Sequence, residues 1–357
     1  MTFDASGNHT EKLVGHYYGT LAGDEPARIT LRADGTLVYI TATGKTKGKW
    51  SATPRPSGNA PLELVAYYDG SNDSCKRATL SRTMPGPGAA QKGPVHELSI
   101  SGVDLSGLNQ AKFTRGLVDA VLPIHDQHRD KGSSHYWAFS REVYRMMTID
   151  DGAAHTDREL HGNRSVSDKW SSLKEVGFHR IDAYVRVPDS ASNYWVFSDS
   201  KYATISIGPR PNHGDKRING DRPIAGHWPS LEGVAQVDAI LPVPDHQRVN
   251  GASRYWVFHE DLCRVIEIHD GTAHTDKLVT ADRHISGLWP SLKGLVGIDT
   301  VLPVPDHQRV SGASRYWVAS GNCYRLIEVQ DGSDHPDKAV TGDRYITSWW
   351  NAAAGVD

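Results

Sequence analysis

The chain has 357 residues, 23% of them charged, and a formal net charge of −3. Its length suits one or two domains, and its near-neutral charge without an obviously basic face argues against nucleic acid or an acidic membrane surface as a partner. Ten Trp and 14 Tyr against four Met favour β-structure over a helical bundle.

The N-terminal stretch MTFDASGNHTEKLVGHYYG has neither the basic nor the apolar region of a secretory signal, and no apolar run has the length of a membrane span. Cysteines are sparse, at Cys75, Cys263 and Cys323. Secreted β-repeat proteins often carry disulfides, so these features predict a cytoplasmic protein.

Residues 1–110 are predicted to form a small antiparallel β domain, either a barrel or a sandwich. The run ARITLRADGTLVYITATG predicts two strands around Asp34-Gly35, which is a strong hairpin signal. The runs PLELVAYYDG, ATLSRT and HELSISG predict further strands. This domain loosely resembles a lipocalin. Two roles are open for it: one wall of a ligand crevice at a domain interface, or a stabilising cap on the following domain.

The sequence then repeats four times, which is an architectural signal. Each repeat contains a Tyr-Trp pair, and these pairs recur at intervals of 58, 61 and 61 residues, with their tryptophans at Trp137, Trp195, Trp256 and Trp317. The phrases VDAVLP, IDAYVR, VDAILP and IDTVLP precede the pairs. A second tryptophan follows each pair, at Trp170, Trp228, Trp289 and Trp349.

Each repeat predicts four strands. In the third repeat, VDAILPV is a short buried run, YWVF a second strand, and LCRVIEI alternates apolar and polar residues, while a fourth strand lies near KLVTADRHI. Four such units, each covering its neighbour's apolar face, predict a four-bladed β-propeller over residues 115–357. The predicted blades cover about 117–177, 180–233, 236–294 and 297–351.

The succession of "IDA", "YWVF", a Tyr-x-Arg strand, "DK" and WPSL resembles the hemopexin-like repeat, and the seed-albumin-type members of that family in particular. The resemblance runs from about Leu117 to Trp350 and occurs in all four units. It implies a small propeller whose first strands line a central channel. Hemopexin-like modules bind haem, polyamines, glycans, ions and proteins, so the fold alone leaves the ligand open.

The family often closes its ring with a disulfide between the first and last blades, and no cysteine pair is placed there in this sequence. We therefore expect closure by packing, with Trp349 and Trp350 as candidates.

The loop between the first two strands of a blade carries the candidate site residues. Blades three and four contain DHQR at 245–248 and 306–309, blade one contains DQHR at 126–129, and the loop of blade two is shorter. Because innermost strands converge on the axis, we expect these loops to surround one mouth, with an entrance at blade two. The predicted catalytic residues are His246, Arg248, His307 and Arg309. The predicted ligand-binding residues are Gln127, His128, Arg129, Gln247 and Gln308. The alternative is a polar turn copied by duplication.

Two further repeated sets bear on metal binding. A His-x-Asp motif precedes the fourth strand of each blade, starting at His155, His213, His274 and His335. We expect no metal there, because ligands must lie within about 2–2.6 Å of one ion and these motifs lie far apart; a turn stabilised by the Asp explains them better. The first strands begin at Asp119, Asp182, Asp238 and Asp299, where the family resemblance leaves a structural Ca²⁺ or Na⁺ ion open. No other cofactor is expected.

The third strand of each blade carries Tyr144, Tyr202, Cys263 or Tyr324, and Arg145, Arg264 and Arg325 follow three of these. We predict that they pack between blades and that Cys263 is a buried thiol. No G-x-S-x-G, P-loop or G-x-G-x-x-G motif points to serine-hydrolase or nucleotide-dependent chemistry.

Three functions are open. The chain could be a carrier or lectin, a cofactor-free cyclase of the hetero-Diels–Alderase type, or a protein-interaction propeller. Our interpretation is a small-molecule pocket at the propeller mouth or the domain interface, leaning to the cyclase, because hydrogen-bond donors in a dry pocket can orient a substrate and stabilise developing charge. The sequence leaves the oligomeric state open.

Overall fold

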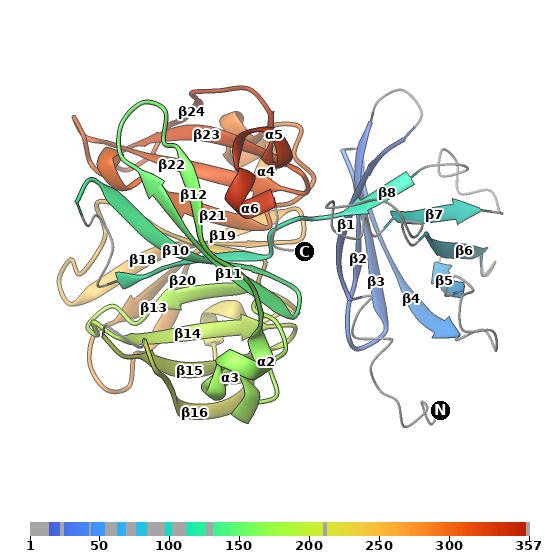
Figure 1. Cartoon of the computed structure of the whole chain (residues 1–357), viewed down its shortest axis with the longest axis horizontal. Helices are drawn as coiled ribbons and strands as arrows, with labels where there is room; N and C mark the ends of the chain where they lie inside the picture. Colours follow the sequence, from blue (N-terminus) through green and yellow to red (C-terminus); the bar gives the residue numbers. More distant parts are fainter. Residues whose placement is uncertain are drawn as a thin grey trace. The chain divides into compact units, whose positions relative to one another are not determined.

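The computed structural model describes residues 14–21, 25–42, 44–53, 63–68, 76–83, 97–101, 112–125, 131–209 and 213–354. The chain divides into two compact units, residues 1–116 and 117–357, both built from antiparallel β-sheet (Figure 1). Within the described ranges, no helix combines the length and the apolar character that crossing a lipid bilayer requires.

The first unit is an eight-stranded antiparallel sheet that closes into a barrel, because β8 pairs back with β1. Its strands follow one another as β1 (Gly15–Thr20), β2 (Pro26–Leu31), β3 (Thr36–Thr41), β4 (Lys45–Thr53), β5 (Glu63–Tyr68), β6 (Lys76–Thr83), β7 (Glu97–Ser101) and β8 (Lys112–Arg115). Of the two predicted forms, barrel and sandwich, the barrel is correct.

The predicted hairpin at Asp34-Gly35 joins β2 to β3. Gly35 adopts a φ of +78°, a conformation that side chains disfavour. The Asp34 carboxylate accepts a hydrogen bond from the Thr36 amide at 2.8 Å, which holds the turn.

The second unit contains four antiparallel sheets, the four predicted blades. Blade one holds β9 (Ala120–Pro123), β10 (Ser133–Ser140), β11 (Val143–Asp150) and β12 (Asp157–Ser165). Blade two holds β13 (Ala183–Arg186), β14 (Asn193–Ser198), β15 (Lys201–Ile207) and β16 (Asp215–Pro223). Blade three holds β17 (Ala239–Pro242), β18 (Ala252–His259), β19 (Leu262–His269) and β20 (Asp276–His284). Blade four holds β21 (Thr300–Pro303), β22 (Ala313–Ser320), β23 (Cys323–Gln330), β24 (Asp337–Ala339) and the short β25 (Arg344–Tyr345).

The innermost strands β9, β13, β17 and β21 contact one another in cyclic order, with β21 returning to β9. The blades therefore surround one axis, as the sequence repeats predicted. Short helical turns follow the outer strands: α2 (Val166–Lys169) and α3 (Ser171–Glu175), η2 (Pro229–Leu231), α4 (Ile285–Leu288) and η3 (Pro290–Leu292), then α5 (Ile346–Trp349) and α6 (Asn351–Ala354).

The repeated tryptophans pack in pairs inside each blade. The ring centroids of Trp137 and Trp170 lie 5.2 Å apart, and the equivalent distances in the other blades are 5.3, 5.1 and 5.1 Å. The fourth pair uses Trp350, so the sequence alignment on Trp349 was wrong by one residue. Trp350 directly follows its helical turn, as Trp170 does, whereas Trp349 is 57% exposed.

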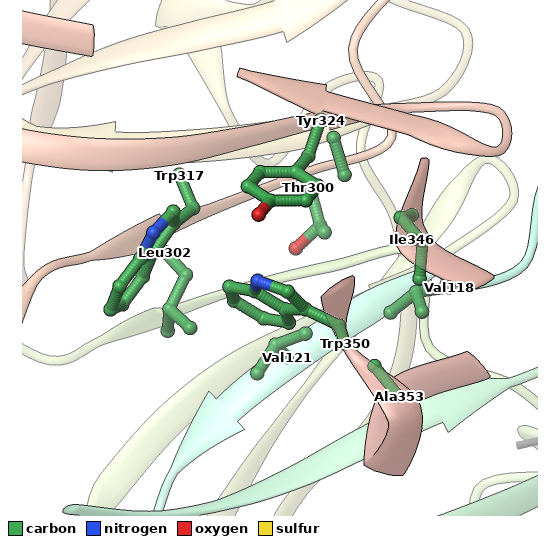
Figure 2. Close-up of a pocket in the computed structure, with 10 residues that line it drawn as sticks. Val118, Val121, Thr300, Leu302, Trp317, Tyr324, Ile346, Trp350 and Ala353 are labelled. Carbon is green, nitrogen blue, oxygen red and sulfur yellow. The ribbon is translucent and has the colours of Figure 1, made fainter. Parts of the chain in front are cut away.

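The ring closes between blades four and one by packing. Figure 2 shows Val118 and Val121 of blade one beside Leu302, Trp317 and Trp350 of blade four. The cavity between them has a volume of about 20 Å³. Hydrogen bonds also cross this seam: among them, Arg145 donates to the Ala352 carbonyl at 3.1 Å, and the Ala352 amide donates to Asp157 at 2.6 Å. The described cysteines, Cys263 and Cys323, are both free. Closure thus involves Trp350, as predicted, and not Trp349.

Candidate functional site

A cavity of about 580 Å³ lies where the innermost strands end. All four blades line it, and the last residues of their first strands, Pro123, Arg186, Pro242 and Pro303, are part of its wall. This volume is in the range that holds a small organic ligand. We call it the axial cavity.

Tyrosines form much of the wall: Tyr136, Tyr184, Tyr194 and Tyr255. Three of them belong to the Tyr-Trp pairs, whose alternation along the second strand sends Tyr and Trp to opposite faces of the sheet. Burial raises the pKa of Tyr184 and Tyr255 well above the usual value for a phenol, and neighbouring Tyr194 raises that of Tyr184 further. These hydroxyl groups therefore stay protonated and can donate hydrogen bonds.

The polar part of the wall is positively charged. His125, Arg186, Gln247 and Arg248 are exposed, and no Asp or Glu is among the described residues that line the cavity. Arg248 is paired, since its Nε lies 3.1 Å from Asp270. Arg186 has no ion-pair partner among the residues that the structure describes. The guanidinium of Arg186 is therefore available to a ligand.

Sequence reasoning missed Tyr184 and Arg186, although the repeats contain a signal for them. At the position of Tyr184 the other blades have Val or Ile, and at the position of Arg186 they have Pro. Blade two therefore departs from the repeat at Tyr184 and Arg186, and both side chains belong to the polar and aromatic part of the cavity wall. From the sequence we predict only an entrance at blade two, where the loop is shorter.

Gln247 and Arg248 are the members of the predicted set that line the axial cavity. Gln247 also holds its own loop together, because its Nε2 donates to the carbonyls of Val243 at 3.0 Å and Arg254 at 2.8 Å. Gln308 makes the equivalent bonds in blade four, and Arg309 pairs with Asp331 at 3.2 Å. The loops thus have the local Arg–Asp pairing of the duplicated-turn alternative. Gln127, His128 and Arg129 lie outside the described residues.

The predicted catalytic residues His246 and His307 lie away from the axial cavity wall. Each donates through Nδ1 to the aspartate that precedes it, at 3.0 Å for Asp245 and 3.1 Å for Asp306. The same aspartates bind the next blade around the ring. Asp245 accepts from His335 of blade four at 2.7 Å, and Asp306 accepts from His155 of blade one at 2.9 Å. These histidines therefore belong to the seams between blades.

The His-x-Asp motif also bridges blades, which corrects the interpretation of its Asp as a local turn residue. Asp276 accepts from the Ser230 amide of the preceding blade at 2.7 Å, and Asp337 accepts from Ser291 at 2.7 Å. Asp215 binds the Ser172 amide in the same way. The histidines of three of these motifs meet loop aspartates of the preceding blade, which distances among the four motifs do not reveal.

The four aspartates that begin the inner strands brace their own blades. Each accepts a hydrogen bond from a backbone amide in the turn between the second and third strands: Asp119 from Arg141 at 2.6 Å, Asp182 from Asp199 at 2.6 Å, Asp238 from Glu260 at 2.8 Å and Asp299 from Gly321 at 2.7 Å. All four are buried. A channel Ca²⁺ or Na⁺ ion, held mostly by backbone oxygens, stays a prediction.

Solved structures similar to this chain include a hemopexin fold protein and plant seed albumins. The hemopexin fold protein CP4 from cow pea is 20% identical with a TM-score of 0.53, and the match covers 68% of this chain and 98% of that one. A plant albumin from Cicer arietinum showing hemagglutination is 19% identical (TM-score 0.52; 67% and 97% covered), and the seed albumin LS24 from Lathyrus sativus is 18% identical (TM-score 0.53; 68% and 99% covered). No protein-family model and no curated protein sequence matches the chain. The predicted hemopexin-like propeller fold is confirmed.

Proposed function

We propose that this chain is a non-catalytic binding protein that holds a small organic anion in the axial cavity. The observation that carries this proposal is the wall itself, with four tyrosines, Arg186 and no described carboxylate. Tyrosine faces contact a flat apolar body, and a guanidinium pairs with a carboxylate, sulfonate or phosphate in a fixed geometry. An anion with an aromatic or otherwise apolar body satisfies both features.

The asymmetry of the ring supports the proposal. If the cavity were only a by-product of ring closure, its four first strands would have no reason to differ in polarity. Blade two alone places Tyr184 and Arg186 where the other blades have an aliphatic residue and a proline. Ligand pockets combine a mostly apolar and aromatic wall with a few polar groups that orient the ligand, and Arg186 beside these tyrosines fits that description.

Binding without turnover fits the positions of the other candidates better than the cyclase does. His246 and His307 are held between blades, and Arg309 is paired with Asp331. Among the described residues, the axial cavity keeps His125 as its one imidazole. The hemagglutination of the Cicer arietinum albumin also favours a binding role, either as a carrier or as a lectin.

The test is a fluorescence titration of the full-length chain with 8-anilinonaphthalene-1-sulfonate, a small aromatic anion. A charge-assisted hydrogen bond contributes about 1.5–3 kcal/mol, so Arg186→Ala should weaken binding about 10- to 100-fold. Arg186→Lys should recover part of the loss, because it restores the charge but not the planar fork. Arg222→Ala is the matched control, since Arg222 is an exposed arginine on the outer strand β16 and should leave binding unchanged. Equal affinity of wild type and Arg186→Ala would refute the site.

Carriage and turnover are separated by mass spectrometry. The chain is incubated with a metabolite extract, and the retained molecule is compared with its form before binding. A molecule released unchanged supports carriage. A product of equal mass but different retention would establish the cyclase instead. Retention of oligosaccharides alone, insensitive to Arg186→Ala, would favour the lectin.

A further inference from the structure

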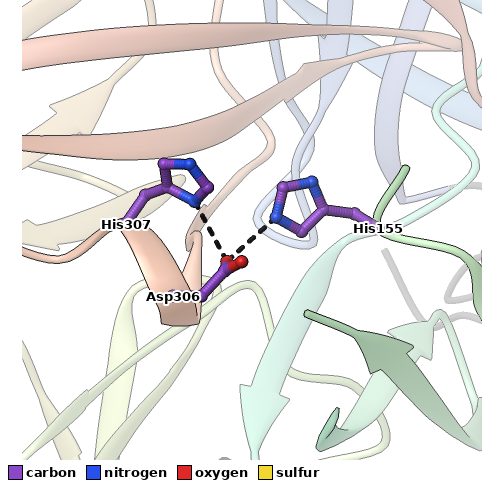
Figure 3. Close-up of side chains that lie close together, drawn as sticks. All are labelled: His155, Asp306 and His307. Atoms are coloured by element: carbon purple, nitrogen blue, oxygen red, sulfur yellow. Dashed lines mark hydrogen bonds and ion pairs between the residues drawn. The ribbon is translucent and has the colours of Figure 1, made fainter. Parts of the chain in front are cut away.

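Two side-chain clusters outside the axial cavity each bring two imidazoles to one carboxylate oxygen. In the first, His155 Nε2 lies 2.9 Å and His307 Nδ1 lies 3.1 Å from Oδ1 of Asp306. Figure 3 shows His155 approaching from the turn after β11, while Asp306 and His307 come from η4 (Pro305–His307). The three nitrogen and oxygen atoms that could serve as ligands lie within 4.8 Å of one another.

The second cluster has the same construction one blade earlier. His335 Nε2 lies 2.7 Å and His246 Nδ1 lies 3.0 Å from Oδ1 of Asp245. Its three ligand atoms also lie within 4.8 Å of one another. One cluster joins blades three and four, and the other joins blades four and one, so the same three-residue arrangement occurs at two seams of the ring.

The surrounding structure holds these groups in position. The second carboxylate oxygen of Asp306 accepts the Gly152 amide at 2.7 Å, which leaves Oδ1 to the imidazoles. The His155 ring packs edge-on against Trp317 at 5.0 Å between centroids. In the other cluster the Gly332 amide binds Asp245 at 2.8 Å, and His335 packs against Trp256 at 5.2 Å. Ligand geometry that is fixed before a metal arrives is a condition for a selective site.

We propose that each cluster binds one divalent transition-metal ion of the Zn²⁺ type through two imidazole nitrogens and one carboxylate oxygen. Two histidines and one carboxylate are a donor set that suits zinc and its neighbours, whereas Ca²⁺ and Mg²⁺ prefer an all-oxygen shell. The ion would link adjacent blades, because each cluster takes residues from both sides of a seam.

The observed distances are close to those that such an ion needs. Tetrahedral Zn²⁺ with bonds of about 2.0–2.1 Å separates its ligand atoms by about 3.3–3.4 Å, so the two short distances in each cluster must widen by about 0.2–0.7 Å. The side chains of His155, Asp306 and His307 are 11%, 14% and 26% exposed. Solvent therefore reaches the cluster and can supply the remaining ligand.

A third seam shows what the second histidine adds. At the seam between blades two and three, Asp189 accepts from His274 at 2.6 Å and from the Gly271 amide at 2.7 Å, as in the two clusters. In this loop Ser190 stands where the other loops have His246 and His307. The link between blades thus forms without a second imidazole. The additional histidine is needed for a three-ligand site, and not for the link.

The experiment measures Zn²⁺ bound per chain by equilibrium dialysis of chelator-treated full-length protein, with Co²⁺ ligand-field absorption as a second readout. His246→Ala and His307→Ala should each remove one bound equivalent, and the double variant should remove two and abolish the corresponding Co²⁺ absorption. Both substitutions leave the Asp245–His335 and Asp306–His155 links in place, so the fold should persist. His274→Ala is the control, because it breaks an equivalent link at the two-ligand seam and should remove none.

The proposal is overturned if the double variant binds as many Zn²⁺ equivalents as wild type, or if wild type binds none at 100-fold molar excess. It is also overturned if His274→Ala loses as much Zn²⁺ as His307→Ala, because the loss would then follow from loosening a seam. Binding of Ca²⁺ in preference to Zn²⁺ at the same residues would contradict the donor chemistry.

Discussion

Arg264 provides the sharpest test of how the blades are held together. Its side chain is 7% exposed and pairs in a bidentate manner with Asp282 of its own blade, through Nε at 2.6 Å and Nη2 at 2.7 Å. Its Nη1 donates to the carbonyls of Ser230 at 2.9 Å and Glu232 at 3.1 Å, both in the preceding blade. One buried guanidinium on β19 therefore links the outer strand β20 of its own blade to the turn around η2 of the preceding blade.

Arg264→Ala removes these bonds and leaves two carbonyls and a carboxylate without their partner. Asp282 is about one-third exposed and keeps His259 as a partner at 3.0 Å, so water and the imidazole compensate in part. We expect a loss of about 3 kcal/mol, at the lower end of values for breaking a buried pair. For a unit of this size that lowers the melting temperature by about 6–12 °C.

Differential scanning fluorimetry of three variants checks this value. Arg264→Lys should recover less than half of the loss, because an ammonium group cannot reproduce the fork. Arg283→Ala is the control, since Arg283 is exposed on the outer strand β20, beside Asp282, and should change the midpoint by less than about 2 °C. A shift below 2 °C for Arg264→Ala would show that the cross-blade bonds are not what stabilises the seam.

The change of this stability difference with pH is an independent test of the same contacts. Burial alone would raise the pKa of Asp282, but hydrogen bonds from His259 and Arg264 outweigh it and hold that pKa well below its usual value. A depressed carboxylate pKa contributes stability that is present above the unfolded pKa of about 3.9 and is lost as the pH falls below it. The difference in melting temperature between wild type and Arg264→Ala should therefore be full at pH 6 and shrink below pH 4. A difference that grows on acidification would refute the assignment.

Two further substitutions and one labelling experiment test the core. Trp350→Ala should destabilise the propeller by about 3 kcal/mol or more in urea unfolding. Trp349→Ala loses an exposed contact with Arg344 and should cost less than about 1 kcal/mol. Equal effects of the two substitutions would contradict the assignment of Trp350 to ring closure. Burial raises the pKa of the Cys263 thiol to about 12, so Cys263 should resist 5,5′-dithiobis(2-nitrobenzoic acid) at pH 8 until the protein unfolds. Its rapid modification in the folded protein, mapped by peptide mass spectrometry, would show that the thiol is accessible.

The propeller could be predicted because its signals are local and repeated. A buried first strand, a Tyr-Trp strand and an alternating third strand recur with nearly constant spacing, and each has a period that one secondary structure explains. The same periodicity could not fix which of two adjacent tryptophans faces the seam. Trp350 faces the seam because it directly follows the four-residue helix α5. The spacing of apolar residues does not predict where such a short helix ends.

The site was harder to predict because its residues are arranged by contacts between blades. Of the two DHQR loops, only the loop of blade three contributes residues to the axial cavity. Gln247 and Arg248 line that cavity, while the His246 ring packs against His335 at the seam. Neither secondary-structure propensity nor residue spacing predicts which of these side chains faces the cavity and which faces the seam, because that depends on where the neighbouring blade places His335.

A ring of duplicated units makes departures from the repeat informative. Packing between blades constrains every copy in the same way, so residues that serve only the ring should be alike in all four. The Trp pairs and the His-x-Asp links follow that rule. Tyr184 and Arg186 depart from the repeat at the axial cavity. Ser190 departs from it at the Asp189–His274 link, which is the one described Asp–His link without a second imidazole. Under the proposed function, Tyr184 and Arg186 adapt blade two to the ligand, whereas blades three and four keep the histidines that would hold metal ions between them.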